Sequence, residues 1–212
     1  MFPIGDDNSA LRTFPLITYA LIALNIVFFF AELNGGDAFI LKWAFVPSRF
    51  ISNPIGDSPT LLTSMFMHAG LAHLGGNMLY LWIFGDNVED RFGHTKFTIF
   101  YLICGLAATF TQMIFDLGSN IPNLGASGAI AGVLGAYIFM FPRGRVSVLM
   151  GRAVIPTPAI VVIGLWFVLQ FYSGLGSITD TAETGGVAYM AHIGGFIAGL
   201  VLTLVFRGGR KS

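Results

Sequence analysis

The chain has 212 residues, of which 55% are hydrophobic and only 10% are charged, and its mean hydropathy is +0.76. Soluble domains carry about 25% charged residues, so this composition excludes an ordinary soluble globular protein and indicates an integral membrane protein. The formal net charge of zero gives no support to a nucleic-acid partner. The single cysteine, Cys104, excludes an intrachain disulfide and a cysteine metal cluster.

Six apolar runs are candidates for membrane-spanning helices, which need about 20 residues to cross a bilayer. They cover residues 14–33, 62–84, 97–115, 124–141, 157–172 and 186–206. We therefore expect an all-α membrane protein, a bundle of six transmembrane helices over residues 14–206, with short segments, 1–13 and 207–212, outside the membrane. The first run is too long for the core of a signal peptide, and no small-residue cleavage site follows it, so we expect it in the mature protein.

The basic residues gather on one side of the expected membrane. One precedes the first span, two lie between the second and third, three lie between the fourth and fifth, and three follow the sixth, which makes nine of the eleven. Since cytoplasmic loops retain Lys and Arg, we expect both termini in the cytoplasm. The location that we expect is the bacterial cytoplasmic (inner) membrane.

Polar side chains interrupt the second span, which reads "MFMHAGLAHLGGNMLYLWIFG". If this stretch is helical, His68, His73 and Asn77 fall within about two and a half turns. His73 and Asn77 are four residues apart and would share one face of the helix. Polar groups within hydrocarbon are costly and commonly mark a functional site, so these side chains are candidates for one.

The fourth and sixth spans each carry a stripe of small residues that begins with one polar group. Ser127 begins a stripe that continues with Ala131 and Gly135, and His192 begins another that continues with glycines three and seven residues further on. Small residues let helices approach closely in lipid, which by itself would account for both stripes. Facing stripes would also bring the hydroxyl of Ser127 to the imidazole of His192, the pairing that a serine nucleophile requires. By the expected topology, the polar groups of all three spans lie in the outer half of the membrane.

Four motifs, in this order along the chain, resemble those of the rhomboid intramembrane serine proteases. They are "HLGGN" at 73–77, "GDNVEDRFG" at 85–93, "GASGAIAG" at 125–132 and "AHIGGFIAG" at 191–199. The resemblance implies a rhomboid-like bundle of six helices that acts as a serine endopeptidase and cleaves single-pass membrane proteins near the outer membrane boundary. It implies no cofactor and no metal, and the partners would be those substrates and the lipid bilayer.

The resemblance also assigns roles to individual residues. It implies that Ser127 is the nucleophile and His192 the general base, in a dyad without an aspartate. The oxyanion hole would consist of His73, Asn77 and the backbone N–H of Ser127, with Gly125 leaving the backbone open to the substrate. Fixed donors of this kind stabilise the negative charge that develops on a peptide carbonyl oxygen during attack.

Two positions bear on how the expected site is held. Ala131 stands where many relatives carry a tyrosine that stacks on the base. Tyr189, three residues before His192, is a candidate substitute, and the alternative is a tyrosine that faces the lipid or the membrane interface. Glu89, within the motif at 85–93, is expected to tie down a helix junction on the cytoplasmic side.

Two other functions remain as alternatives. An inactive rhomboid-like relative could act as a membrane-protein binding or quality-control factor, but such a relative would be expected to lose Ser127 or His192. A helical bundle could instead bind haem or a metal ion through His68, His73 and His192. That hypothesis accounts neither for Asn77 nor for the serine.

Overall fold

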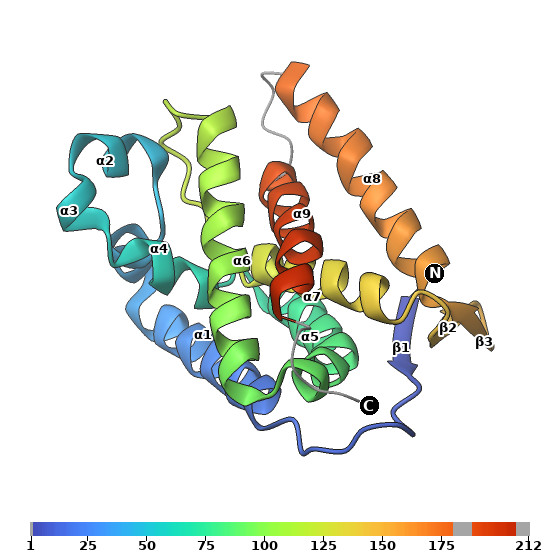
Figure 1. Cartoon of the computed structure of the whole chain (residues 1–212). Helices are drawn as coiled ribbons and strands as arrows, with labels where there is room; N and C mark the ends of the chain where they lie inside the picture. Colours follow the sequence, from blue (N-terminus) through green and yellow to red (C-terminus); the bar gives the residue numbers. More distant parts are fainter. Residues whose placement is uncertain (1, 180–187, 207–212) are drawn as a thin grey trace.

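Long helices make up most of the structure, a computed structural model that describes residues 2–179 and 188–206. They are α1 (Leu16–Trp43), α5 (Leu71–Phe92), α6 (His94–Phe115), α7 (Ser127–Met140), α8 (Ala159–Thr179) and α9 (Tyr189–Phe206) (Figure 1). Within the described residues, four helices, α1, α6, α8 and α9, are long and apolar enough to cross a membrane. The chain is therefore a mostly helical membrane protein, as its composition predicts.

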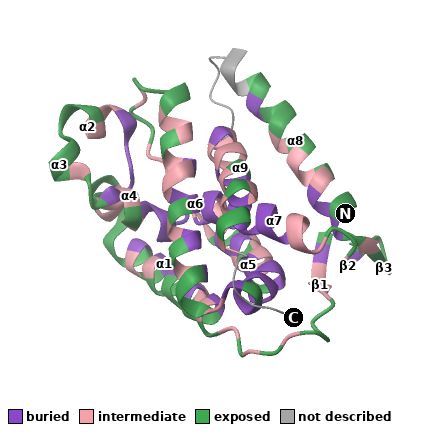
Figure 2. Ribbon diagram, in the orientation of Figure 1, coloured by how far each residue is buried: buried purple, intermediate pink, exposed green. Residues whose placement is uncertain are grey.

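The short helix α7 occupies the centre of the bundle, where α5, α6 and α9 pack around it. Every residue from Gly128 to Tyr137 is buried, and α7 is purple beside its label in Figure 2. A Cβ on Gly132 would lie 2.5 Å from the Cβ of Cys104 in α6, so only glycine allows α6 to come this close. The prediction that the small residues of the fourth span serve helix packing is confirmed.

The second predicted span is not one helix. Its first residues belong to two short helices, α4 (Thr60–Thr63) and η1 (Ser64–Phe66), and α5 begins only at Leu71. His68 therefore precedes α5, and the prediction that it lies on this helix is wrong. Hydropathy does not reveal the break, because apolar residues continue across it.

The long connection between the first two predicted spans is largely helical. α1 runs past the predicted end at residue 33 to Trp43, across a kink at Gly36, where φ is 58° and ψ is −153°. Two short helices follow, α2 (Pro47–Ser52) and α3 (Pro54–Asp57).

We expected an all-α protein, and this expectation is wrong: the described part of the chain contains a three-stranded antiparallel sheet. Its strands are β1 (Phe2–Asp6), β2 (Arg145–Met150) and β3 (Ala153–Pro158), in the order β1-β2-β3. Alternate residues of β2, Val146 and Val148, are buried, which is the period of a strand with one face covered. The hairpin of β2 and β3 is local, and the sequence analysis missed it. β1 and β2 are far apart in the sequence, so only the folded chain brings them together. The helix of the fifth predicted span, α8, consequently begins at Ala159, after β3, and not at residue 157.

One end of the bundle is held together by Glu89, which is fully buried near the end of α5. Its carboxylate accepts hydrogen bonds from the backbone N–H groups of Ile17 at 2.9 Å and Thr18 at 2.8 Å, and from the Thr18 hydroxyl at 2.7 Å. Nδ1 of His94 lies 2.5 Å from the same carboxylate. One side chain thus joins the start of α1, the end of α5 and the start of α6, which is the structural role expected from the motif.

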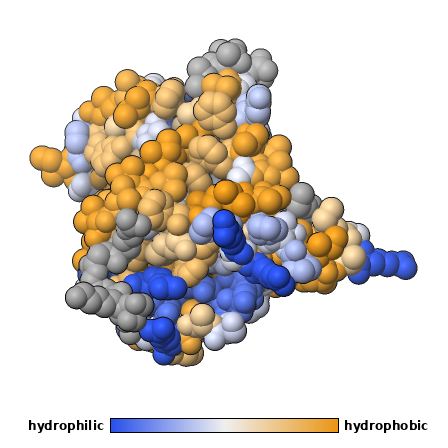
Figure 3. Space-filling model, turned by 45° about the vertical axis from the view of Figure 1, so that its right-hand side comes forward, coloured by the Kyte–Doolittle hydropathy of each residue, from blue (hydrophilic) through white to orange (hydrophobic). Residues whose placement is uncertain are grey.

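The surface of the molecule is divided into polar and apolar parts. On the face in Figure 3, hydrophilic residues gather toward the lower end, and hydrophobic residues cover the upper part. This division is typical of a protein that keeps its polar end in water and its apolar sides in lipid.

Candidate active site

Ser127 and His192 meet where α7 and α9 begin. Ser127 is the first residue of α7, and His192 lies in the first turn of α9. Nε2 of His192 is 2.8 Å from Oγ of Ser127, which is hydrogen-bond distance. The predicted start of the sixth span, at residue 186, lies outside the described residues, as does the basic tail 207–212.

Glycines let α7 and α9 come close enough for this contact. A Cβ on Gly195 would lie 2.0 Å from the carbonyl oxygen of Gly128, and a Cβ on Gly199 would lie 2.1 Å from that of Gly132. The backbones of the two helices therefore touch. On α9 the contact follows the predicted stripe. On α7 it involves Gly128 and Gly132, each one residue after a predicted position, and also Gly135 of the predicted stripe, where a Cβ would lie 2.5 Å from the carbonyl oxygen of Phe196.

Asn77 projects from α5 into a cavity of about 480 Å³ that also contains Ser127 and His192. Its side chain is buried, and its Nδ2 has no hydrogen-bond partner among the residues that the structure describes. A buried donor left unpaired costs free energy, which is expected at a place where a ligand supplies the missing acceptor.

His73 lines the same cavity from the first turn of α5. Its Nδ1 accepts a long hydrogen bond, 3.4 Å, from the backbone N–H of Ala69, which leaves the proton of the neutral ring on Nε2. A Cβ on Gly125 would lie 3.2 Å from this Nε2 and 3.5 Å from Oγ of Ser127. Gly125 also has a φ of 134°, a conformation that favours glycine, and so it keeps the space between His73 and Ser127 open.

Two side chains of α8 surround the imidazole of His192, and sequence reasoning found neither of them. Oε1 of Gln170 lies 2.6 Å from Nδ1 of His192. The ring of Trp166 has its centroid 5.9 Å from that of His192, at an interplanar angle of 39°. The aromatic ring beside His192 is thus that of Trp166 and not that of Tyr189, and Ala131 has no ring to place there. Gln170 was detectable as an amide within an apolar span, the same signal that selected Asn77.

His68 is buried beside the site. Its backbone N–H donates to both carboxylate oxygens of Glu32, at 3.0 and 3.1 Å, and its ring meets that of His73 edge-on with centroids 5.1 Å apart. Within residues 2–179 and 188–206, no three His, Cys, Asp or Glu side chains are grouped closely enough to hold a metal ion. His68, His73 and His192 therefore form no such group.

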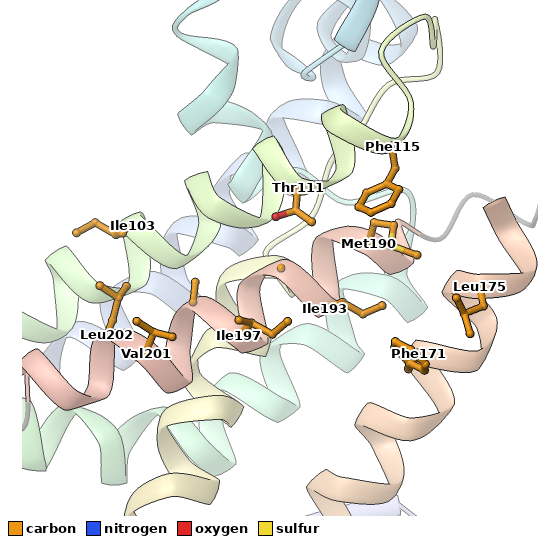
Figure 4. Close-up of a pocket in the computed structure, with 12 residues that line it drawn as sticks. Ile103, Thr111, Phe115, Phe171, Leu175, Met190, Ile193, Ile197, Val201 and Leu202 are labelled. Carbon is orange, nitrogen blue, oxygen red and sulfur yellow. The ribbon is translucent and has the colours of Figure 1, made fainter.

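A second cavity, of about 650 Å³, lies between α6, α8 and α9 (Figure 4). Its lining is apolar apart from Thr111, whose hydroxyl donates to the carbonyl oxygen of Ala107 at 2.8 Å. None of the side chains that line this cavity is titratable, so the cavity at Ser127 is the candidate for a catalytic site.

The part of the chain that forms this site matches a known protein family. The rhomboid family model, described as "Rhomboid domain", matches residues 56–209. The chain belongs to the rhomboid family. This rhomboid protein is therefore a multi-pass membrane protein of a family of intramembrane serine proteases.

Curated rhomboid proteins resemble the chain over most of its length. It is 34% identical over 194 residues to the protein named Rhomboid protease GluP of Bacillus subtilis (strain 168). The aligned residues cover 90% of this chain and 35% of that protein. It is 27% identical over 190 residues to Rhomboid protein 1, mitochondrial, of Saccharomyces cerevisiae. Here the aligned residues cover 87% of this chain and 51% of the relative. The rhomboid protein described here thus spans about a third to a half of the length of these relatives.

Proposed function

We propose that this rhomboid protein is a serine endopeptidase that cleaves the transmembrane segments of single-pass membrane proteins near the outer boundary of the membrane. The observation that carries the proposal is the 2.8 Å distance between Nε2 of His192 and Oγ of Ser127, in a cavity that also contains His73 and Asn77. Membership of the rhomboid family and similarity to a relative named a protease support it.

The proposed reaction follows from the acid–base properties of the pair. Oγ of Ser127 attacks the carbonyl carbon of the scissile peptide bond while Nε2 of His192 takes its proton, because a free hydroxyl is too weakly acidic to attack unaided. The C–N bond then breaks, His192 gives the proton to the leaving amine, and the acyl group remains on Ser127 as an ester. A water molecule, deprotonated by the same imidazole, hydrolyses the ester and restores the hydroxyl.

Three donors would hold the oxyanion of the tetrahedral intermediates. They are Nδ2 of Asn77, the Nε2–H group of His73 and the backbone N–H of Ser127. The first N–H groups of a helix lack partners within the helix, and the helix dipole favours an anion beside them. Donors that are fixed before the reaction, in a site with little water, commonly make the largest contribution to catalysis.

We also propose that α5 and α7 lie in the membrane, which gives six membrane helices over residues 14–206. α7 has 14 residues and is about 21 Å long, shorter than the roughly 30 Å of hydrocarbon in a bilayer. If its far end reaches the cytoplasmic boundary, Ser127 lies below the outer surface of the membrane. Arg91 and Lys96 lie on either side of the junction between α5 and α6, close to Glu89. They support a cytoplasmic location for this end of the bundle and for both termini. A bacterial cytoplasmic membrane remains our proposal for the location.

Purified protein in lipid vesicles tests the proposed activity with a single-pass model substrate and a fluorophosphonate probe, which reacts with activated serines. We expect cleavage and labelling by the unaltered protein. Ser127→Ala and His192→Ala should lose both, with cleavage slower by at least about 10³-fold. Ser52→Ala, at an exposed serine in α2, is the control that should retain both.

The same assay separates the alternatives. Cleavage by Ser127→Ala at about one tenth or more of the unaltered rate would refute the nucleophile assignment, because loss of the nucleophile lowers the rate by several orders of magnitude. A folded unaltered protein that neither cleaves nor is labelled would favour the inactive binding or quality-control factor.

A further inference from the structure

The imidazole of His192 is held at both of its nitrogens by side chains from two different helices. Nε2 lies 2.8 Å from Oγ of Ser127 in α7, and Nδ1 lies 2.6 Å from Oε1 of Gln170 in α8. The proposed reaction uses only Nε2. The contact at Nδ1 therefore needs an explanation of its own.

We propose that Gln170 is a positioning residue, which accepts a hydrogen bond from Nδ1–H of His192 and keeps Nε2 free to take the proton of Ser127. This inference rests on the proposed function and deepens it. A neutral imidazole carries one proton, and an amide oxygen can only accept a hydrogen bond. The proton must then be on Nδ1, so that Nε2 keeps its lone pair. In the opposite tautomer Nε2 already carries the proton and cannot act as a base.

The packing of α8 against α9 holds Gln170 at this distance. Phe167 stacks on Phe196 of α9, with ring centroids 4.4 Å apart and an interplanar angle of 28°. One turn before Gln170, Trp166 lies beside the imidazole of His192. These contacts restrain both the separation of the helices and the plane of the imidazole, which the small side chain of Ala131 does not restrain.

An amide suits this position because it lies within an apolar helix. A carboxylate at Nδ1, as in serine proteases with an aspartate, would favour the protonated base more strongly, but a charge within a membrane helix is costly. Gln170 accepts the same hydrogen bond without a charge. We therefore expect Gln170 to fix the tautomer and orientation of His192 while contributing less to catalysis than a charged partner would.

Kinetics of two Gln170 variants test this role. Gln170→Leu removes the acceptor, and we expect kcat to fall about ten- to a hundredfold, part of what a positioned base supplies, with KM changed less than about twofold. Gln170→Glu restores an acceptor, so it should recover most of kcat and move the acid limb of the pH–rate profile to higher pH, because a carboxylate favours the imidazolium. Leu169→Ala, at the exposed neighbour on α8, is the control that should change neither.

Nitrogen-15 NMR of protein with labelled histidines tests the tautomer without any turnover, with the His192 signals assigned by their loss in His192→Ala. We expect a protonated Nδ1 and a bare Nε2 in the unaltered protein, and loss of this single tautomer in Gln170→Leu. A proton on Nε2 in the unaltered protein would overturn the proposal, as would a Gln170→Leu variant with unchanged kcat and tautomer. If the unaltered protein does not cleave, the proposed function fails, whereas a Gln170-dependent proton on Nδ1 would still support the hydrogen bond inferred here.

Discussion

Gly195 of α9 lies directly against the backbone of α7, and a Cβ on Gly195 would come within 2.0 Å of the carbonyl oxygen of Gly128. Next to this contact, the ring of His192 reaches the hydroxyl of Ser127. The same glycine that packs the two helices therefore also sets the distance between the two groups proposed to carry out the reaction.

Gly195→Ala should weaken both packing and activity. The added methyl group meets backbone and not a movable side chain, so α9 must shift, and we expect a loss of about 1–3 kcal/mol in the free energy of unfolding. Cleavage should fall further than this loss of stability explains, because the Ser127–His192 distance changes. Thermal unfolding and cleavage rates measure the two effects. Gly164→Ala, in α8 where a Cβ would meet open space, is the control, and equal cleavage by the two variants would contradict the argument.

Asn77→Ala should impair turnover more than binding. One of three proposed oxyanion donors is lost, which typically costs about 10²–10³ in kcat, whereas the ground-state substrate needs this donor less. Separate determination of kcat and KM tests the prediction. Asn34→Ala, at an exposed amide on α1, should leave both constants unchanged. If only KM rises in Asn77→Ala, this residue serves binding or structure and not the oxyanion.

Gly125→Ala should inactivate the protein with little effect on the helices. The φ of 134° disfavours any side chain, and the new Cβ would lie 3.0 Å from Cε1 of His73 in the space proposed for the oxyanion. We expect kcat to fall by about 10² or more, as for loss of an oxyanion donor. Gly75→Ala is a matched control, since its Cβ would meet no described atom within 4 Å. Comparable activity of the two variants would refute the role of Gly125.

Asp6, on β1 and outside the membrane helices, should make stability depend on pH. Burial raises the pKa of Asp6 from 3.8 to about 7, and the charges of Asp86 and Asp7 act in the same direction, against the hydrogen bond that the Tyr137 hydroxyl donates. A carboxyl group whose pKa is higher in the folded state binds more protons when folded, in the interval between the two pKa values. Stability should therefore fall as the pH rises from about 4 to about 7.

Unfolding temperatures across this interval check the effect of Asp6. Asp6→Asn should weaken the dependence because this group no longer titrates. Asp7→Asn should retain most of it, since hydrogen bonds from Ser9 lower the pKa of Asp7 and its charge is only a minor cause of the raised pKa of Asp6. A constant unfolding temperature of the unaltered protein from pH 4 to pH 7 would contradict the predicted effect, and an unchanged dependence in Asp6→Asn would show that Asp6 is not its cause.

The site should select substrates by the ease with which their helices unwind. A protease must place an extended strand at its nucleophile, but a peptide in lipid is held helical because its backbone hydrogen bonds cannot be replaced there. Gly or Pro weakens a helix by about 1–3 kcal/mol per residue. A single-pass substrate with its N-terminus outside, a small residue before the cut and a helix breaker shortly after it should be cleaved in the outer half of its span.

Replacing that breaker by Leu should slow cleavage, and sequencing the new terminus of the product locates the cut. A substrate with Leu exchanged for Ile at a distant position in the same span serves as the control. Cleavage in the cytoplasmic half, or indifference to the breaker, would contradict the proposed depth of Ser127 and the need for unwinding.

Much of the candidate site could be predicted from the sequence because its signals are local. Composition identified a membrane protein, and polar residues within apolar runs selected His73, Asn77, Ser127 and His192 as candidates. The glycines of the fourth and sixth spans indicated which two helices would touch. These inferences need only hydropathy and spacing along one helix, which the order of residues specifies directly.

Other features depend on contacts between segments that are distant in the sequence. The pairing of β1 with β2, the break before α5 that separates His68 from this helix, and the approach of Gln170 to His192 have no signature in local periodicity. Each depends on where a helix or strand comes to lie when the whole chain packs. The sequence by itself determined the membrane class and the candidate pair of serine and histidine, whereas the tertiary structure alone decided what surrounds that histidine, because the neighbours of a buried side chain are set by packing between helices.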